Sequence, residues 1–257
     1  MAISVEANQY HLDDSDMVGF EDLLDYCNGL VISDGQAIRL VHFSVRNYLD
    51  RHQVIPEDAK ETYHVIACCT VLSFDVLKEC DCDPSFNIID GLPFLDYSAN
   101  NLTFHLSKVE RGHYPETTSA VMKLLESQGH RHVYYKINSD IKWQCDIPRL
   151  NSACAIGYED AVRALLSEGE VEINAKDPPA GLASLLWAVL MGHEEVVRRL
   201  LGEKLGWSCN GTAPLSIAIG RQRTGILRLL LEMGVEANSA YNEVSQFGYN
   251  STQFDRC

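Results

Sequence analysis

The residues best suited to metal chemistry are cysteines and histidines, and their spacing completes no metal site. Cys80 and Cys82, in the stretch ECDCD, look like one half of a zinc site. No second pair stands at zinc-finger distance, and zinc ordinarily takes four well-spaced ligands. We interpret the stretch as a solvated acidic loop. His130 and His132 could also ligate a metal, but adjacent surface histidines in a linker are the commoner case. The sequence therefore predicts no metal centre and no cofactor.

Motifs for catalysis are also missing from the sequence. It contains no G-x-S-x-G, H-E-x-x-H, G-x-G-x-x-G or G-x-x-x-x-G-K-[ST] segment. His42, close to the end of an expected strand, is interpreted as a locally hydrogen-bonded histidine and not as a catalytic one. Cys68 and Cys69 fall within a helical run, and only His64 is a nearby basic residue that could lower a thiol pKa. We expect a protein that is not an enzyme.

Composition limits the partners and the compartment. The 257 residues carry a net charge of -15, which favours solubility and opposes binding to nucleic acid or to anionic membranes. The first 60 residues hold eleven acidic and four basic residues, a poor phosphate-binding surface. No apolar run approaches the roughly 18–20 residues of a membrane span, and the first residues do not form a secretory signal. Nine irregularly spaced cysteines then predict reduced thiols and a cytoplasmic protein.

The N-terminal region predicts a helix, a hairpin and a second helix. Residues 19–27 place apolar side chains on one helical face. Asp34-Gly35 is a strong hairpin signal between strands at Leu30–Ile32 and Ile38–His42. Ser44 is then expected to cap a helix that runs through Leu49. This order is consistent with the wing end of a winged-helix domain, and a generic α/β fragment stays open as the alternative.

A helical spacer is expected next, from 57 to 145. Amphipathic patterns predict helices over 57–78, 92–106 and 117–128. Residues 129–145 are either a linker or a degenerate first repeat.

Three later stretches share one skeleton. Leu150, Leu185 and Leu215 align at spacings of 35 and 30 residues, and aligned alanines and leucine pairs follow each of them. These spacings bracket the 33-residue ankyrin period, and the stretches resemble ankyrin repeats, each with two antiparallel helices and a projecting turn. Gly157 and Gly192 stand at the expected corners between the paired helices. We expect about three repeats over 146–240.

The resemblance implies a partner-binding surface. In the ankyrin pattern T-P-L-H-x-A the variable residue x faces the concave side. In the three repeats this residue is Ser152, Trp187 and Ile217 in turn. Lys176 and Asp177 lie in an expected finger at the rim. Trp187 is either an interface anchor, since tryptophan is enriched at hot spots, or a residue packed on a neighbouring finger.

The N-terminal region carries a second resemblance, on the runs CNGLV, RLVHFS and NYL at 27–49. These runs are similar to the winged-helix segment that follows the NACHT NTPase module in fungal NLR-like ankyrin proteins, named after GPI inositol-deacylase. The aromatic-Gly pair usual in the spacer of that family is replaced by Leu102-Thr103, and the chain has no P-loop.

Together these patterns predict a mainly α protein. Its parts are a small winged-helix-like α/β unit (1–56), the spacer (57–145), an ankyrin-repeat solenoid (146–240) and a tail (241–257). The resemblance implies a non-catalytic protein–protein interaction module of an NLR-like signalling protein. The alternatives are the C-terminal regulatory portion of a nucleotide-driven NACHT switch ATPase and, less favoured, a winged-helix DNA binder. Aromatic residues scattered through the tail either fold back as a cap or follow an array that is cut short.

Overall fold

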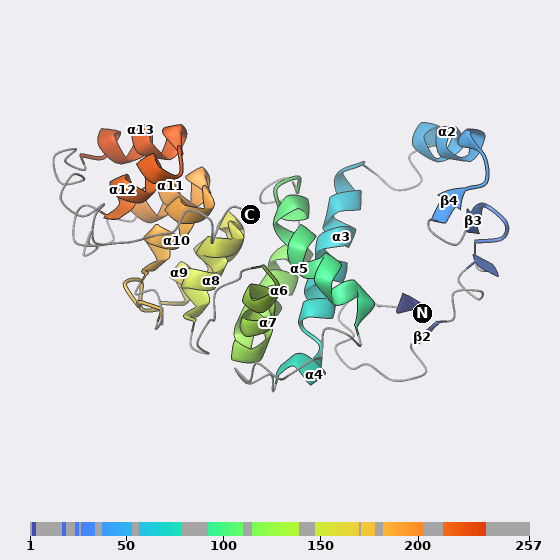
Figure 1. Ribbon diagram of the computed structural model, residues 1–257, viewed down its shortest axis with the longest axis horizontal. Helices are drawn as coiled ribbons and strands as arrows, with labels where there is room; N and C mark the ends of the chain where they lie inside the picture. Colours follow the sequence, from blue (N-terminus) through green and yellow to red (C-terminus); the bar gives the residue numbers. More distant parts are fainter. Residues whose placement is uncertain are drawn as a thin grey trace.

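A computed structural model describes most of the residues expected to fold. These residues are 2–3, 17–18, 24–25, 27–33, 38–52, 57–78, 92–109, 115–138, 147–169, 171–177, 182–202 and 213–234. Over these ranges the protein is mainly helical, with twelve helices and two small antiparallel two-stranded sheets (Figure 1). The predicted helix at 19–27 and the predicted turn at Asp34-Gly35 lie largely or wholly outside the described residues.

The predicted hairpin is confirmed. Its strands β3 (Val31–Ser33) and β4 (Ile38–Leu40) pair antiparallel, with Val31 opposite Leu40. A second pair, β1 (Ala2–Ile3) with β2 (Met17–Val18), was not predicted.

Helix α2 (Phe43–His52) follows the hairpin and begins one residue before the predicted Ser44 cap. Nδ1 of His42 accepts hydrogen bonds from the Ser44 hydroxyl (2.8 Å) and from the Ser44 backbone N–H (3.2 Å). The interpretation of His42 as a locally bonded histidine is thus confirmed. No residue of α2 is buried.

The spacer region forms a group of packed helices (Figure 1). They are α3 (Glu57–Leu72), α4 (Asp75–Lys78), α5 (Pro93–Leu106), α6 (Pro115–Glu126) and α7 (Gln128–Asn138). Helix α3 packs against α5 and α6, and α7 packs against α4, α5 and α6. The predicted helices at 57–78, 92–106 and 117–128 are confirmed in outline, with a break at Ser73 and Phe74.

The structure of α7 corrects the predicted surface position of its two histidines. His130 and His132 were expected on the surface of a linker, but both are buried. Nε2–H of His130 donates to the carbonyl oxygen of Phe74 at 3.1 Å. Burial lowers the pKa of both imidazoles, because removal from water disfavours the charged ring. These two histidines are part of the packing between α7 and its neighbours.

The three predicted helix pairs are present. They are α8 (Arg149–Ile156) with α9 (Glu159–Glu168), α10 (Ser184–Met191) with α11 (Glu194–Gly202), and α12 (Ala213–Gly220) with α13 (Thr224–Glu232). The inner helices α8, α10 and α12 pack in series, and so do the outer helices α9, α11 and α13. Acidic residues open α9 and α11, where they complement the positive end of the helix dipole.

Each corner uses a left-handed residue at the repeat spacing. Gly157 and Gly192 have φ of +84° and +89°, a conformation that favours glycine. The third corner is Gln222, with φ of +55°, and not the nearby Gly220. Thus the third repeat holds an ordinary side chain where the first two have glycine.

The residue after each corner reaches back to the preceding element. His193 donates from Nε2–H to the carbonyl oxygen of Ala155 at 3.0 Å, and Arg223 donates from Nη2–H to that of Met191 at 3.3 Å. At the equivalent first position, the Tyr158 hydroxyl lies 3.2 Å from the Thr118 hydroxyl of α6. The spacer therefore contacts the first repeat at the place where one repeat contacts the next. One hydrophobic core runs from Val65 of α3 to Leu230 of α13.

Candidate functional site

The predicted partner stripe is largely inside the protein. Trp187 is 1% exposed, and its ring centroid lies 5.8 Å from that of Tyr135 on α7. Ser152 is also buried. The expectation that Trp187 stands open on a concave face is therefore corrected, because α7 supplies an aromatic residue that covers it. Of the two alternatives, burial favours packing inside the protein, where Tyr135 of a spacer helix is one contact.

Asp177 is also buried, where it bonds to Leu182. Its Oδ1 accepts the backbone N–H of Leu182 at 2.5 Å, and its own N–H donates to the Leu182 carbonyl oxygen at 3.1 Å. Asn151 holds the same finger from α8, since its amide donates to the carbonyl oxygens of Ala175 (3.1 Å) and Leu182 (3.0 Å). Ser184 completes the link by donating to Oδ1 of Asn151 at 2.6 Å. This buried network links Ala175 and Leu182 to the inner helices α8 and α10.

Two of the predicted residues remain accessible. Lys176 is exposed next to the buried Asp177, and Ile217 on α12 is partly exposed. On the same helix Ile219 is 54% exposed. The two side chains are two positions apart and so lie on different sides of the helix, with Ile217 against the core and Ile219 exposed. We call Ile217 and Ile219 the α12 surface.

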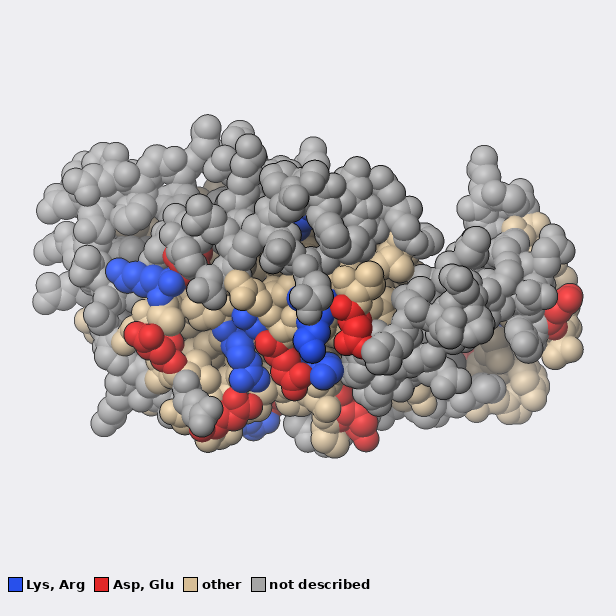
Figure 2. All heavy atoms as spheres, turned by 90° about the horizontal axis from the view of Figure 1, so that it is seen from below, with Lys and Arg blue, Asp and Glu red and all other residues tan. Residues whose placement is uncertain are grey.

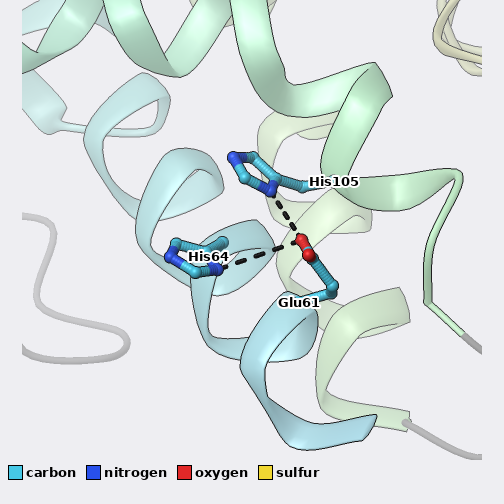
Figure 3. A group of neighbouring side chains, drawn as sticks. All are labelled: Glu61, His64 and His105. Carbon is cyan, nitrogen blue, oxygen red and sulfur yellow. Dashed lines mark hydrogen bonds and ion pairs between the residues drawn. The ribbon is translucent and has the colours of Figure 1, made fainter. Parts of the chain in front are cut away.

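A second group of polar side chains gathers between α3 and α5. Glu61, His64 and His105 point toward one another (Figure 3). Oε2 of Glu61 lies 2.6 Å from Nδ1 of His105 and 3.9 Å from Nδ1 of His64. The two imidazole rings are stacked, with centroids 4.7 Å apart and planes 13° apart. His105 is buried, while His64 faces solvent.

Two further groups touch this cluster. The hydroxyl of Tyr97 lies 3.0 Å from Nε2 of His105, and Nζ of Lys108 lies 3.7 Å from Oε1 of Glu61. Partial burial acts to raise the pKa of Glu61, but the hydrogen bond to His105 and the nearby cationic groups lower it overall. Burial raises the pKa of Tyr97, so its hydroxyl keeps its proton. The carboxylate thus sits among two imidazoles and an ammonium group.

Sequence reasoning missed this cluster. One signal was present, because Glu61 and His64 are three residues apart on a predicted helix and so share a face. His105 lies 44 positions from Glu61 in the sequence, and only the packing of α5 on α3 brings it there. The possible metal ligands noted from the sequence are not part of this cluster. Cys80 and Cys82 lie outside the described residues, and His130 is bonded to the backbone carbonyl of Phe74.

The geometry of the C-terminal half is that of a repeat protein: helix pairs of one design, stacked in series. Residues 150–241 match the family model for ankyrin repeats, in three copies. This segment is thus a set of ankyrin repeats, a class that usually mediates protein–protein interaction. A search of curated proteins finds no match to the chain. None of the helices described is long and apolar enough to cross a membrane.

Proposed function

We propose that this protein is a non-catalytic protein–protein interaction module that acts in the cytoplasm as part of an NLR-like signalling system. The observation that carries this proposal is the set of three ankyrin repeats at 150–241. The resemblance of residues 27–49 to the winged-helix segment of NACHT-associated proteins supports the signalling part. The hairpin followed by α2 is compatible with that resemblance.

The partner surface that we propose is the α12 surface, with Lys176 at the rim of the first finger. Ser152, Trp187 and Asp177 support the repeats from the interior and would act on binding only through the fold. On the face seen in Figure 2, Lys and Arg side chains lie beside Asp and Glu side chains. This mixed charge, with a net charge of -15 over the chain, favours a protein partner over nucleic acid.

The test is affinity capture with the full chain, followed by measured binding of the protein recovered. Aspartate at the exposed position of the α12 surface (Ile219→Asp) should weaken binding at least tenfold, since a charge would be placed in an apolar contact. Met233→Asp is the control, because Met233 is 45% exposed at the C-terminal end of α13. Equal binding by both variants would reject the α12 surface. Failure to capture any protein specifically would reject the interaction module.

A second candidate is the regulatory end of a nucleotide-driven switch ATPase, and one observation favours it. The hairpin and α2 expose a set of large apolar side chains: Leu30, Ile32, Leu40, Val41, Phe43 and Tyr48. An apolar surface of this kind suits packing against a further domain. If the native transcript continues upstream in frame into a P-loop, this candidate replaces the stand-alone module.

The lesser candidate, a DNA-binding winged helix, has little support, since Arg46 of α2 faces Asp50 at 3.7 Å. A salt-sensitive gel shift would revive it.

A further inference from the structure

We propose that Glu61, His64 and His105 form a binding site for a divalent transition-metal ion, best suited to zinc, that joins helices α3 and α5. Two imidazole nitrogens and one carboxylate oxygen form a ligand set that zinc uses when its fourth position is left to water. The three potential ligand atoms lie within 4.8 Å of one another. Imidazole favours zinc, copper or nickel over magnesium and calcium, which prefer oxygen ligands alone.

The geometry is close to that of a bound ion. Zinc bonds of about 2.0–2.1 Å at tetrahedral angles place ligand atoms roughly 3.3–3.5 Å apart. Here Oε2 of Glu61 is 2.6 Å from Nδ1 of His105 and 3.9 Å from Nδ1 of His64. The short distance must open and the 3.9 Å distance must close, each by less than about 1 Å, and the remaining pair of ligand atoms, up to 4.8 Å apart, must approach by about 1.3–1.5 Å. His64 can make this change, because its side chain is 53% exposed.

The surroundings support the buried ligand. When Nδ1 of His105 binds a metal, Nε2 carries the proton and can donate to the Tyr97 hydroxyl, which lies 3.0 Å away. A hydrogen bond of this kind fixes the ring orientation of metal-binding histidines. Tyr97 is thus placed to position His105. Because a metal bond lies in the plane of an imidazole ring, the exposed His64 ring must tilt out of the stack with His105 to share the ion (Figure 3).

Lys108 is the competing cation. Its Nζ lies 3.7 Å from Oε1 of Glu61 and 4.1 Å from the centroid of the Phe104 ring. The side chain is 48% exposed, so it can swing into solvent when a metal binds. Removal of its charge should therefore strengthen metal binding. A purely structural ion pair around Glu61 gives no such gain, so this variant separates the two explanations.

The experiment titrates the full chain with ZnCl₂ under reducing conditions and follows the thermal midpoint, with Co²⁺ absorption as a second readout. Zinc should raise the midpoint through mass action, because it binds the folded state. His64→Ala should weaken zinc binding at least tenfold and abolish the stabilisation, and its exposed position leaves the fold intact. Lys108→Met should bind several-fold more tightly. His52→Ala, which removes an exposed histidine of α2, is the matched control and should behave like the unaltered chain.

Two results would overturn the site. One is the absence of a zinc-dependent midpoint shift in the unaltered chain at micromolar zinc. The other is an equal shift in the unaltered chain and in His64→Ala, which would assign the binding to cysteines or to other surface groups. His105→Gln provides a further check with a ring-free side chain, but the conclusion rests on His64→Ala, which does not disturb the core.

Discussion

Replacement of Trp187 by alanine should unfold part of the protein, as expected for a packed residue and not for an interface anchor. The indole is 1% exposed and packs beside Tyr135 in the core shared by α7 and α10. Large-to-small changes of this kind cost about 3–5 kcal/mol, because the transfer energy is lost and a cavity remains. Domains of this size are stable by about 5–15 kcal/mol. The variant therefore loses a large fraction of its stability.

Urea denaturation followed by far-UV circular dichroism measures this loss as a shift in the midpoint. Met233→Ala is the control, since Met233 is 45% exposed and should change stability by less than about 1 kcal/mol. A cycle with Tyr135→Ala then isolates the aromatic pair, whose rings are 5.8 Å apart and tilted by 50°. We expect a coupling of about 0.5–1.5 kcal/mol.

A Trp187→Ala variant that melts like the unaltered chain but binds its partner more weakly would refute the buried position of Trp187. That outcome would mean that Trp187 faces a partner and that α7 does not cover it. Weaker capture together with a lower midpoint supports the buried arrangement, since loss of binding then follows from loss of fold.

Three further predictions rest on single residues. Gln222→Gly should stabilise the third repeat by up to about 1–2 kcal/mol, because glycine accepts the positive φ of this corner at lower cost; an unchanged or lower urea midpoint would contradict this. Arg131→Met should lower the unfolding free energy by about 2–4 kcal/mol, since the buried guanidinium donates to the carbonyl oxygens of Leu125, Glu126 and Ile147; a change below 1 kcal/mol would show that these bonds matter little. Burial lowers the pKa of His193 below its ordinary 6.5, so the unfolded chain binds a proton at this residue more readily than the folded chain does. The neutral, buried His193 therefore contributes stability above pH 6.5. This contribution is lost as the pH falls through the lower pKa of the folded state. Unfolding free energy should thus fall between pH 7.5 and 5.5, and His193→Gln should flatten that slope.

The sequence predicts elements well here because their signals are local. The aligned leucines mark three helix pairs, and corner glycines mark the first two of them. The hairpin follows from two apolar runs. Side-chain environment depends on contacts that no local signal records. Trp187 is buried by Tyr135, which lies in a helix that the sequence left open as a linker. Glu61 meets His105 only because α5 packs on α3 in one register, and apolar periodicity does not fix that register.

The same contacts lead us to expect that residues 146–240 alone are only marginally stable. Each later repeat is held by the one before it, through His193 to Ala155 and through Arg223 to Met191. The first repeat has no such neighbour and uses the spacer instead, through Tyr158 to Thr118 of α6 and through Ile147 to Arg131 of α7. A fragment that starts at 146 loses these bonds and leaves Trp187 without its aromatic partner. Because repeat proteins gain stability from interfaces between neighbours, removal of the first interface weakens every repeat after it.

Circular dichroism melts of 146–240 and 115–240 test this directly. The shorter fragment should melt broadly and at low temperature, while the longer one, which keeps α6 and α7, should recover much of the cooperativity of the full chain. A sharp, high-temperature melt of 146–240 would mean that three repeats stand without the spacer. In that case the continuous core from Val65 to Leu230 would join two independently stable parts. The expected result makes α6 and α7 the N-terminal cap of the repeats, so a change in the spacer helices would reach the partner surface through the fold.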